Sequence, residues 1–199
     1  ALCTADDFIF EKVNAIEGPG YTEYARNGRT RHWRPGPMGS RGSEDSLQSR
    51  LRRLGVLNNK HVPQAYLTAS IEQRLALLQG LMDTDGDVRK KGCCTFNNTN
   101  ETLARQVQEL VQSLGVKASL CSGPAMLNGQ PFGVCWKVHF FMRGAASLPR
   151  KAARCRDASR TTERYIRAEP AGVADTVCIE VDHPSHLFLC TRGYIPTHN

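Results

Sequence analysis

The chain has 199 residues, of which 40% are hydrophobic, and it carries a formal net charge of +7. This length and composition exclude a disordered or fibrous protein and allow either one large domain or two small ones. No apolar run reaches the roughly 18–20 residues that cross a bilayer, and residues 1–10 lack the layout of a signal peptide, so we expect a cytoplasmic protein without a membrane partner.

The charge excess favours a polyanionic partner, since the pI is about 9.1. The basic residues either contact nucleic acid or form a solvated surface. Eight cysteines are present without any C-x-x-C pair, which argues against a zinc ribbon. The basic residues gather in two runs, which are Arg26, Arg29, Arg31 and Arg34, and then Arg150, Lys151, Arg154, Arg156, Arg160, Arg164 and Arg167.

The first quarter of the chain is mixed in composition and ends in a linker. Residues 9–16 predict one or two strands. Residues 35–45 carry four turn-forming residues in their first five positions and predict a loop. We therefore place the first domain boundary after residue 40 and expect a helix over residues 46–54, where leucines recur at helical spacing.

Two further helices are marked by their caps. Ser70, with Gln73 three positions on, has the pattern of a capping box for a helix over residues 71–83. Asn100 predicts the start of another helix, and Gly115 lies where that helix should end.

Predicted strands alternate with these helices. Residues 92–97 predict a short strand, and residues 132–142 predict a long one with alternating apolar positions. This order predicts an α+β unit, for which we expect the boundaries 41–155. Residues 177–181 and 187–190 predict two short strands near the end of the chain.

Residues 78–86, with the sequence Leu-Gln-Gly-Leu-Met-Asp-Thr-Asp-Gly, resemble the LAGLIDADG signature of homing endonucleases. Blocks at 60–63 and 103–115 resemble the segments that flank this signature in inteins. The resemblance implies that Gly80 allows two such helices to pack closely and that Asp85 holds a divalent metal. Two such acids from paired motifs bind Mg²⁺ in that family, whereas one motif is found here. Mg²⁺ and double-stranded DNA are thus the expected cofactor and partner of a cleavage activity.

The last part of the chain resembles the terminal blocks of inteins, which excise themselves from a host polypeptide and join the flanking extein segments. Residues 181–189 contain the H-x-F pattern of the penultimate block, and residues 193–199 end in His-Asn like the last block. The resemblance implies that Asn199 attacks its own main-chain carbonyl and closes a succinimide, which breaks the following peptide bond. His198 and His186 are the candidates to assist this step.

The resemblance implies a mostly β Hint horseshoe splicing domain with an inserted α+β LAGLIDADG endonuclease-like domain. Residues 1–40 and 156–199 would form the splicing domain, and residues 41–155 the insertion. The partners are then the flanking extein segments, and splicing itself needs no cofactor. The fragments at 77–86 and 181–189 look most similar to inteins of bacterial or phage replicative helicases and other ATPases.

The first residue is Ala1, whereas most inteins begin with a Cys or Ser nucleophile. The chain resembles class three inteins, which place a cysteine where Cys178 stands and a threonine where Thr197 stands. This implies that Cys178 attacks the carbonyl before Ala1 and that the acyl group passes to a downstream Ser, Thr or Cys. That class also has a Trp two residues after a His, whereas Trp33 directly follows His32. We expect His32 to activate the upstream bond and Trp33 to line it, with a structural histidine and a core tryptophan as the alternative.

Three other interpretations are open at this point. The chain could be a class one intein whose first Cys is replaced by Ala. It could be a homing endonuclease or DNA-binding module whose splicing ends are vestigial. It could also be the C-terminal part of a split intein, because residues 1–54 match the usual N-terminal blocks poorly.

Overall fold

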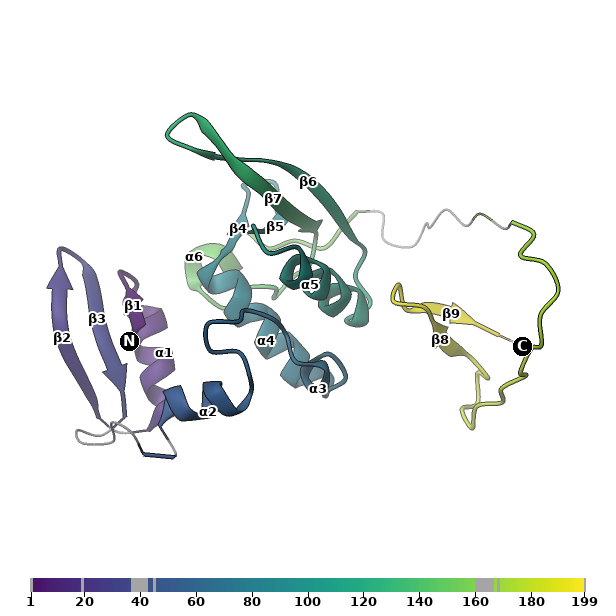
Figure 1. The fold of residues 1–199 in the computed structure, drawn as a ribbon, viewed down its shortest axis with the longest axis horizontal. Coiled ribbons are helices and arrows are strands. Elements are labelled where there is room, and N and C mark those ends of the chain that lie inside the picture. Colours follow the sequence, from purple (N-terminus) through teal and green to yellow (C-terminus); the bar gives the residue numbers. More distant parts are fainter. Residues whose placement is uncertain are drawn as a thin grey trace.

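The computed structural model describes residues 2–18, 20–36, 43–44, 46–159, 167 and 169–198. In these residues the chain is a mixed α/β structure with three separate antiparallel sheets (Figure 1). No helix among them is both long and apolar enough to cross a membrane.

The N-terminal unit is a three-stranded antiparallel sheet of order β1-β3-β2 with one helix packed against it. Phe10 of the helix and Trp33 of the sheet are both buried, and their ring centroids lie 5.1 Å apart in an edge-to-face arrangement. This aromatic contact holds the helix against the sheet. The elements are β1 (Leu2–Thr4), α1 (Asp7–Glu17), β2 (Tyr21–Asn27) and β3 (Thr30–Pro35).

Helix α1 corrects the sequence prediction, because residues 9–16 were expected to form strands. The side chain of Asp6 caps the helix by accepting a hydrogen bond from the backbone N–H of Phe8 at 3.2 Å. The β-branched Ile9 and Val13 favour strands, but this preference is weak and depends on the neighbours. The cap and the burial of Phe10 on one helical face decide in favour of the helix.

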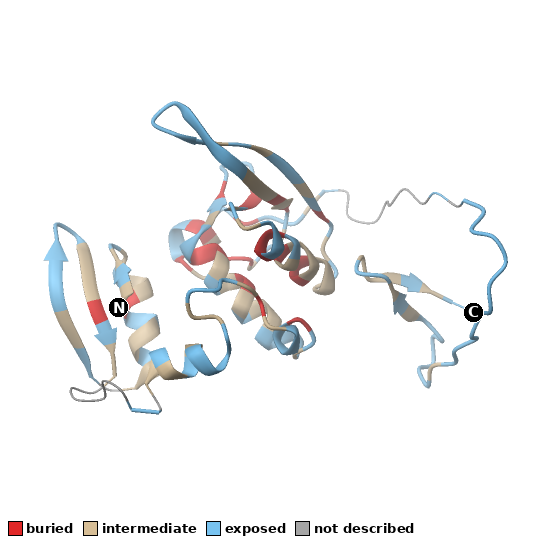
Figure 2. Ribbon diagram, in the orientation of Figure 1, coloured by how far each residue is buried: buried red, intermediate tan, exposed pale blue. Residues whose placement is uncertain are grey.

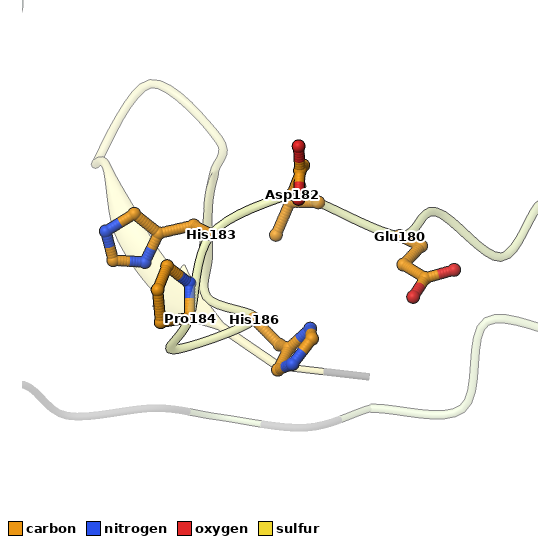
Figure 3. Close-up of a pocket in the computed structure, with 6 residues that line it drawn as sticks. Glu180, Asp182, His183, Pro184 and His186 are labelled. Carbon is orange, nitrogen blue, oxygen red and sulfur yellow. The ribbon is translucent and has the colours of Figure 1, made fainter.

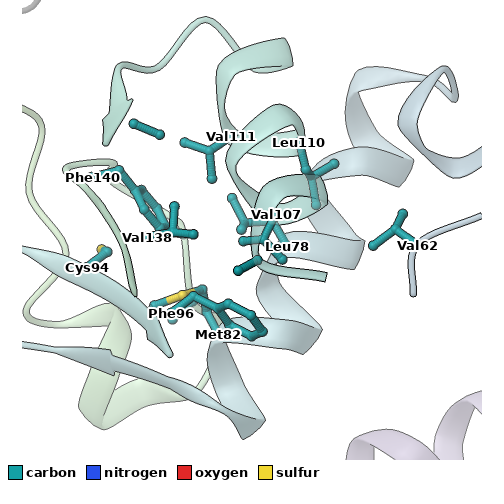
Figure 4. Close-up of a cluster of buried hydrophobic side chains, with 14 of the residues drawn as sticks. Val62, Leu78, Met82, Cys94, Phe96, Val107, Leu110, Val111, Val138 and Phe140 are labelled. Atoms are coloured by element: carbon teal, nitrogen blue, oxygen red, sulfur yellow. The ribbon is translucent and has the colours of Figure 1, made fainter. Parts of the chain in front are cut away.

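The central unit packs two helices against one face of a four-stranded sheet of order β4-β5-β7-β6. Leu78, Met82, Val107 and Val138 have no exposed surface and form the middle of its core (Figure 4). The fully buried residues of the chain concentrate in this unit (Figure 2). Its elements are α3 (Gln64–Leu67), α4 (Ile71–Thr84), β4 (Gly86–Val88), β5 (Cys94–Asn98), α5 (Glu101–Ser113), β6 (Ala118–Leu127), β7 (Gln130–Phe140) and α6 (Pro149–Ala152).

The caps predicted for the central helices are confirmed. Ser70 and Gln73 form a capping box at the start of α4. The side chain of Asn100 accepts a hydrogen bond from the N–H of Leu103 at the start of α5, and Gly115 follows that helix with a φ of +80°. The helix expected over 46–54 is α2 (Leu47–Arg53).

The strands of the central unit are confirmed at β5 and β7, while β6 was not predicted. Strand β6 contains Ser, Cys, Gly and Pro residues, so it lacks a clean alternation of apolar and polar side chains. It pairs with β7 through a tight turn at Asn128 and Gly129, where both residues have positive φ angles of 50° and 80°. This is the geometry of a type I′ hairpin turn. The α+β class predicted for the middle of the chain is therefore confirmed.

The C-terminal part contains one two-stranded hairpin, β8 (Phe188–Cys190) with β9 (Ile195–Thr197). Strand β8 confirms the prediction for 187–190, whereas the strand predicted at 177–181 is wrong. Those residues have strand-forming side chains, but they belong to none of the three sheets in the described part of the chain. Figure 1 shows the N-terminal sheet and this hairpin on opposite sides of the central unit.

A buried carboxylate joins the end of α4 to the segment that leads into α6. One oxygen of Asp83 accepts hydrogen bonds from the backbone N–H groups of Ser147 and Leu148, each at 2.9 Å. Its other oxygen accepts a hydrogen bond from the hydroxyl of Ser147. Asp83 is only 6% exposed, so these donors replace the water that the carboxylate loses on folding.

The side chain of Lys151 clamps the backbone at the same place. Its ammonium group donates to the carbonyl oxygens of Met82, Asp83 and Gly86 at 2.8, 2.8 and 2.7 Å. Burial lowers the pKa of Lys151 from its usual value, so these three acceptors and the helix C-terminus are what hold the charge in place. Lys151 therefore binds backbone carbonyl groups before and after Asp85, and these hydrogen bonds fix the conformation of the turn that contains Asp85.

We expect Asp83→Ala to lower the free energy of unfolding by about 2–3 kcal/mol, because it leaves two backbone donors and one hydroxyl without their charged acceptor. Urea denaturation followed by circular dichroism measures this change. The matched control is Asp85→Ala, two residues away and exposed, for which we expect a change within about 0.5 kcal/mol. Equal losses in the two variants would contradict the assigned role of Asp83.

Candidate functional site

The C-terminal hairpin brings two of the predicted histidines together. His186 lies two residues before β8, and His198 directly follows β9, whose residue Thr197 pairs with Phe188. The rings of His186 and His198 are perpendicular, with centroids 6.5 Å apart. Asn199 lies outside the described residues, but it is joined to His198 by a peptide bond. The hairpin therefore brings the imidazole of His186 to the imidazole of His198, the residue that precedes Asn199 in the sequence.

His186 also borders a hollow of about 550 Å³ (Figure 3). Its φ of +53° lies in the left-handed region, which few residues other than glycine adopt. Such strained positions recur at functional sites. The hollow is lined by Glu180, Val181, Asp182, His183, Pro184 and His186.

Cys178 lies in the segment 169–181, which has no helix or strand, and is exposed. The structure does not bring it to the N-terminal strand, since Figure 1 shows this segment and β1 on opposite sides of the central unit. Ala1 lies outside the described residues, so the predicted contact between Cys178 and the upstream junction stays a prediction.

His32 and Trp33 lie on β3, directly beside the first strand. Leu2 pairs with Trp33, and Cys3 pairs with His32. Trp33 is 1% exposed, and its indole N–H donates to the side-chain oxygen of Asn14 at 3.1 Å. Trp33 is therefore a core residue of the N-terminal unit, whereas the partly exposed His32 lies opposite a residue close to the N-terminus.

Asp85 is exposed at the end of α4, where it is the C-cap residue. The other acid of the motif, Asp83, is occupied by its backbone donors. A Cβ atom at Gly80 would meet nothing within 4 Å, so in the described structure no second helix packs closely there. The described residues contain no group of three or more His, Cys, Asp or Glu side chains that could hold a metal ion. One exposed carboxylate does not by itself fit Mg²⁺, which requires several oxygen ligands.

The face of the central sheet turned away from the helices is positively charged. Along β7, Val138 and Phe140 are buried on the helix side, so Lys137 and His139 point to the other face. His139 Nδ1 hydrogen-bonds with the hydroxyl of Thr95 at 3.0 Å. Burial, and then the positive charges of Arg89 and Lys137, lower the pKa of His139.

A second hollow of about 650 Å³ adjoins this face. It combines two lysines and a histidine with hydroxyl groups, which suit phosphate oxygens, and also contains the carboxylate of Asp157, which pairs with Arg143. It is lined by Lys91, Gly115, Val116, Lys117, Ser119, His139, Phe140, Phe141, Asp157, Ala158 and Ser159.

Comparison with known proteins identifies the central unit. Residues 72–126 match the family model described as LAGLIDADG-like domain. Residues 72–126 are therefore similar to a LAGLIDADG-like domain. A replicative DNA helicase DnaB from Mycobacterium intracellulare is 37% identical over 161 residues, which cover 77% of this chain and 28% of the helicase. The chain thus spans less than a third of the length of that relative. The two findings confirm the resemblance to an intein with a LAGLIDADG region.

The match to the LAGLIDADG-like domain begins within α4 and ends within β6, so it includes both Gly80 and Asp85. Sequence reasoning missed the charged sheet face of this domain. The signal was present, because the apolar positions predicted for 132–142 place Lys137 and His139 on the opposite side of the strand. The contribution of Thr95 required the pairing of β5 with β7, which a single sequence does not reveal.

Proposed function

We propose that this chain catalyses protein splicing as an intein and joins the extein segments that flank it. The observation that carries the proposal is the ring contact of His186 with His198, beside the residue that must cyclise. The similarity to DnaB supports a replicative helicase as the host, because DnaB helicases are known to carry inteins.

The downstream bond breaks by cyclisation of Asn199. Its side-chain amide nitrogen attacks its own main-chain carbonyl carbon, a succinimide closes, and the amine of the next residue leaves. Nucleophile and electrophile belong to one residue, so the reaction has a high effective molarity. Either His198 or His186 donates the proton that the leaving amine requires.

The upstream bond breaks by attack of the Cys178 sulfur on the carbonyl that precedes Ala1, which forms a branched thioester and releases the amine of Ala1. We assign the protonation of this amine to His32, which lies opposite Cys3 on the strand that pairs with β1. The acyl group then passes from Cys178 to the Ser, Thr or Cys that begins the downstream extein. This acceptor directly follows the terminal sequence Thr197, His198 and Asn199.

These steps require the segment around Cys178 to lie against the N-terminal sheet. Strand β1 is an edge of that sheet, and residues 177–181 have strand-forming side chains but belong to none of the three sheets in the described residues. Pairing of the two would join residues 1–40 to residues 156–199 in one β layer. That layer corresponds to the Hint horseshoe, with residues 41–155 as the inserted domain.

We expect a precursor with the chain between two reporter proteins, and Ser as the first downstream residue, to yield ligated product. Cys178→Ala should abolish the branched thioester, because the first nucleophile is lost. Cys190→Ala, in the same part of the chain, is the matched control and should splice normally. Splicing that survives Cys178→Ala but is accelerated by Ala1→Cys would instead identify a class one intein. Product that appears only with an added N-terminal fragment would identify a split intein.

We expect His186→Ala or His198→Ala to slow cleavage at the downstream junction by about 10²–10⁴-fold, since each removes one proton donor. Gel electrophoresis of the released downstream reporter measures the rate. His61→Ala, which changes a partly exposed histidine before α3, serves as control and should leave the rate unchanged. A normal rate in both site variants would argue against the histidine pair as the assisting group.

DNA binding by the LAGLIDADG-like domain is a second proposed function, favoured by the positive charge of the open sheet face. Lys137 and Arg89 both lie close to His139 there. Contacts of this kind bind phosphates irrespective of sequence and weaken as salt rises. Asp85 is the one exposed acid of the motif at 78–86, and alone it does not extend this proposal to DNA cleavage by one chain.

We expect the chain to bind duplex DNA with an affinity that falls steeply with salt. Lys137→Gln should lower the slope of log affinity against log salt by about one, because one phosphate contact is lost. Arg105→Gln is the control, since Arg105 belongs to α5 on the other side of the sheet. A slope that changes equally in both variants would argue against the open face as the binding surface.

A further inference from the structure

The β6–β7 hairpin extends well beyond the rest of its sheet. Strand β5 pairs with β7 only from Trp136 to Phe140, opposite Asn98 to Cys94. The part of the hairpin that precedes Trp136 on β7, together with its partner residues on β6, forms a two-stranded ribbon that projects past the helices (Figure 1). We call residues 123–135 the ribbon. It closes through the tight turn at Asn128 and Gly129, so its tip is narrow.

The tip of the ribbon is apolar and exposed. Met126, Leu127, Phe132 and Val134 have 59%, 58%, 68% and 51% of their surface in contact with solvent. No charged residue occurs anywhere in the ribbon, although the chain as a whole carries a net charge of +7. Exposed apolar side chains gathered in one place mark a surface that a partner covers.

The base of the ribbon indicates what that partner is. Lys137 directly follows Trp136 on β7, and it lies on the open face together with His139 and near Arg89. The hollow that includes Lys91 and Lys117 adjoins the same face. Charge complementarity therefore favours a polyanion at the base, and a duplex that binds there has its grooves within reach of the ribbon.

We propose that the ribbon is an apolar wedge for duplex DNA, with Met126, Leu127 and Phe132 inserted between neighbouring base pairs at a kink. The proposal rests on the proposed DNA binding. Proteins that kink DNA insert side chains of this kind, because they replace part of the stacking that the bases lose. The absence of charge suits the interior of the base stack, while Lys137 at the base of the ribbon contacts a phosphate outside it.

The test uses the full chain and a duplex of about 30 bp with fluorophores at both ends and one 2-aminopurine at a TA step, the kind of step that kinks most easily. Binding by the wild-type chain should shorten the distance between the ends and raise the 2-aminopurine fluorescence. The double variant Met126→Ser, Phe132→Ser should lose both signals while the salt slope of binding stays unchanged. Both side chains are exposed, so these substitutions should not unfold the domain.

Ile71→Ser is the matched control, because Ile71 is 62% exposed and lies on α4, away from the ribbon. Phe132→Trp, which keeps an apolar wedge, should retain both signals. Salt-dependent binding to a duplex that stays straight and stacked would overturn the wedge but leave DNA binding intact. Failure to bind duplex DNA at any salt would overturn DNA binding itself and the wedge with it. A ribbon variant that kinks DNA normally, but changes the sedimentation of the free chain from dimer to monomer, would assign the ribbon to self-association and overturn the wedge.

Discussion

The hydrogen bonds of Asp83 and Lys151 at the end of α4, here called the polar clasp, are the interaction on which the rest of the structure depends. Asp83 holds the segment before α6, and Lys151 holds the backbone on both sides of Asp85. The same segment reaches the N-terminal unit, because Lys12 of α1 donates to the hydroxyl of Ser147 at 2.6 Å. One buried carboxylate therefore supports both the central core and its contact with helix α1 of the N-terminal unit.

The clasp also separates the roles of two neighbouring acids. The carboxylate of Asp83 accepts hydrogen bonds from backbone N–H groups. A buried carboxylate that loses such partners lowers the stability of the fold. Asp85 makes no such contribution to stability and stands exposed at the helix end. A substitution of Asp85 would thus leave the stability of the domain nearly unchanged, whereas a substitution of Asp83 would lower it.

The proposed activities lie in parts of the chain that differ in packing. The LAGLIDADG-like domain has the continuous core, and its proposed DNA surface is the sheet face that the helices leave open. The proposed splicing residues lie in a small sheet at one end and in an extended segment with a hairpin at the other. Neither of these parts buries much apolar surface alone, which gives each a physical reason to pack against the other.

The sequence by itself determined the central helices, the strands β5, β7 and β8, and the blocks that resemble inteins. These features depend on local signals, such as the capping box at Ser70 and the alternation along β7, which act over a few residues. Only the tertiary structure decided that residues 9–16 form a helix, that Trp33 is a core residue, and that His186 meets His198. Each of these outcomes depends on a partner distant in sequence, whereas strand-forming composition alone does not produce a strand at residues 177–181.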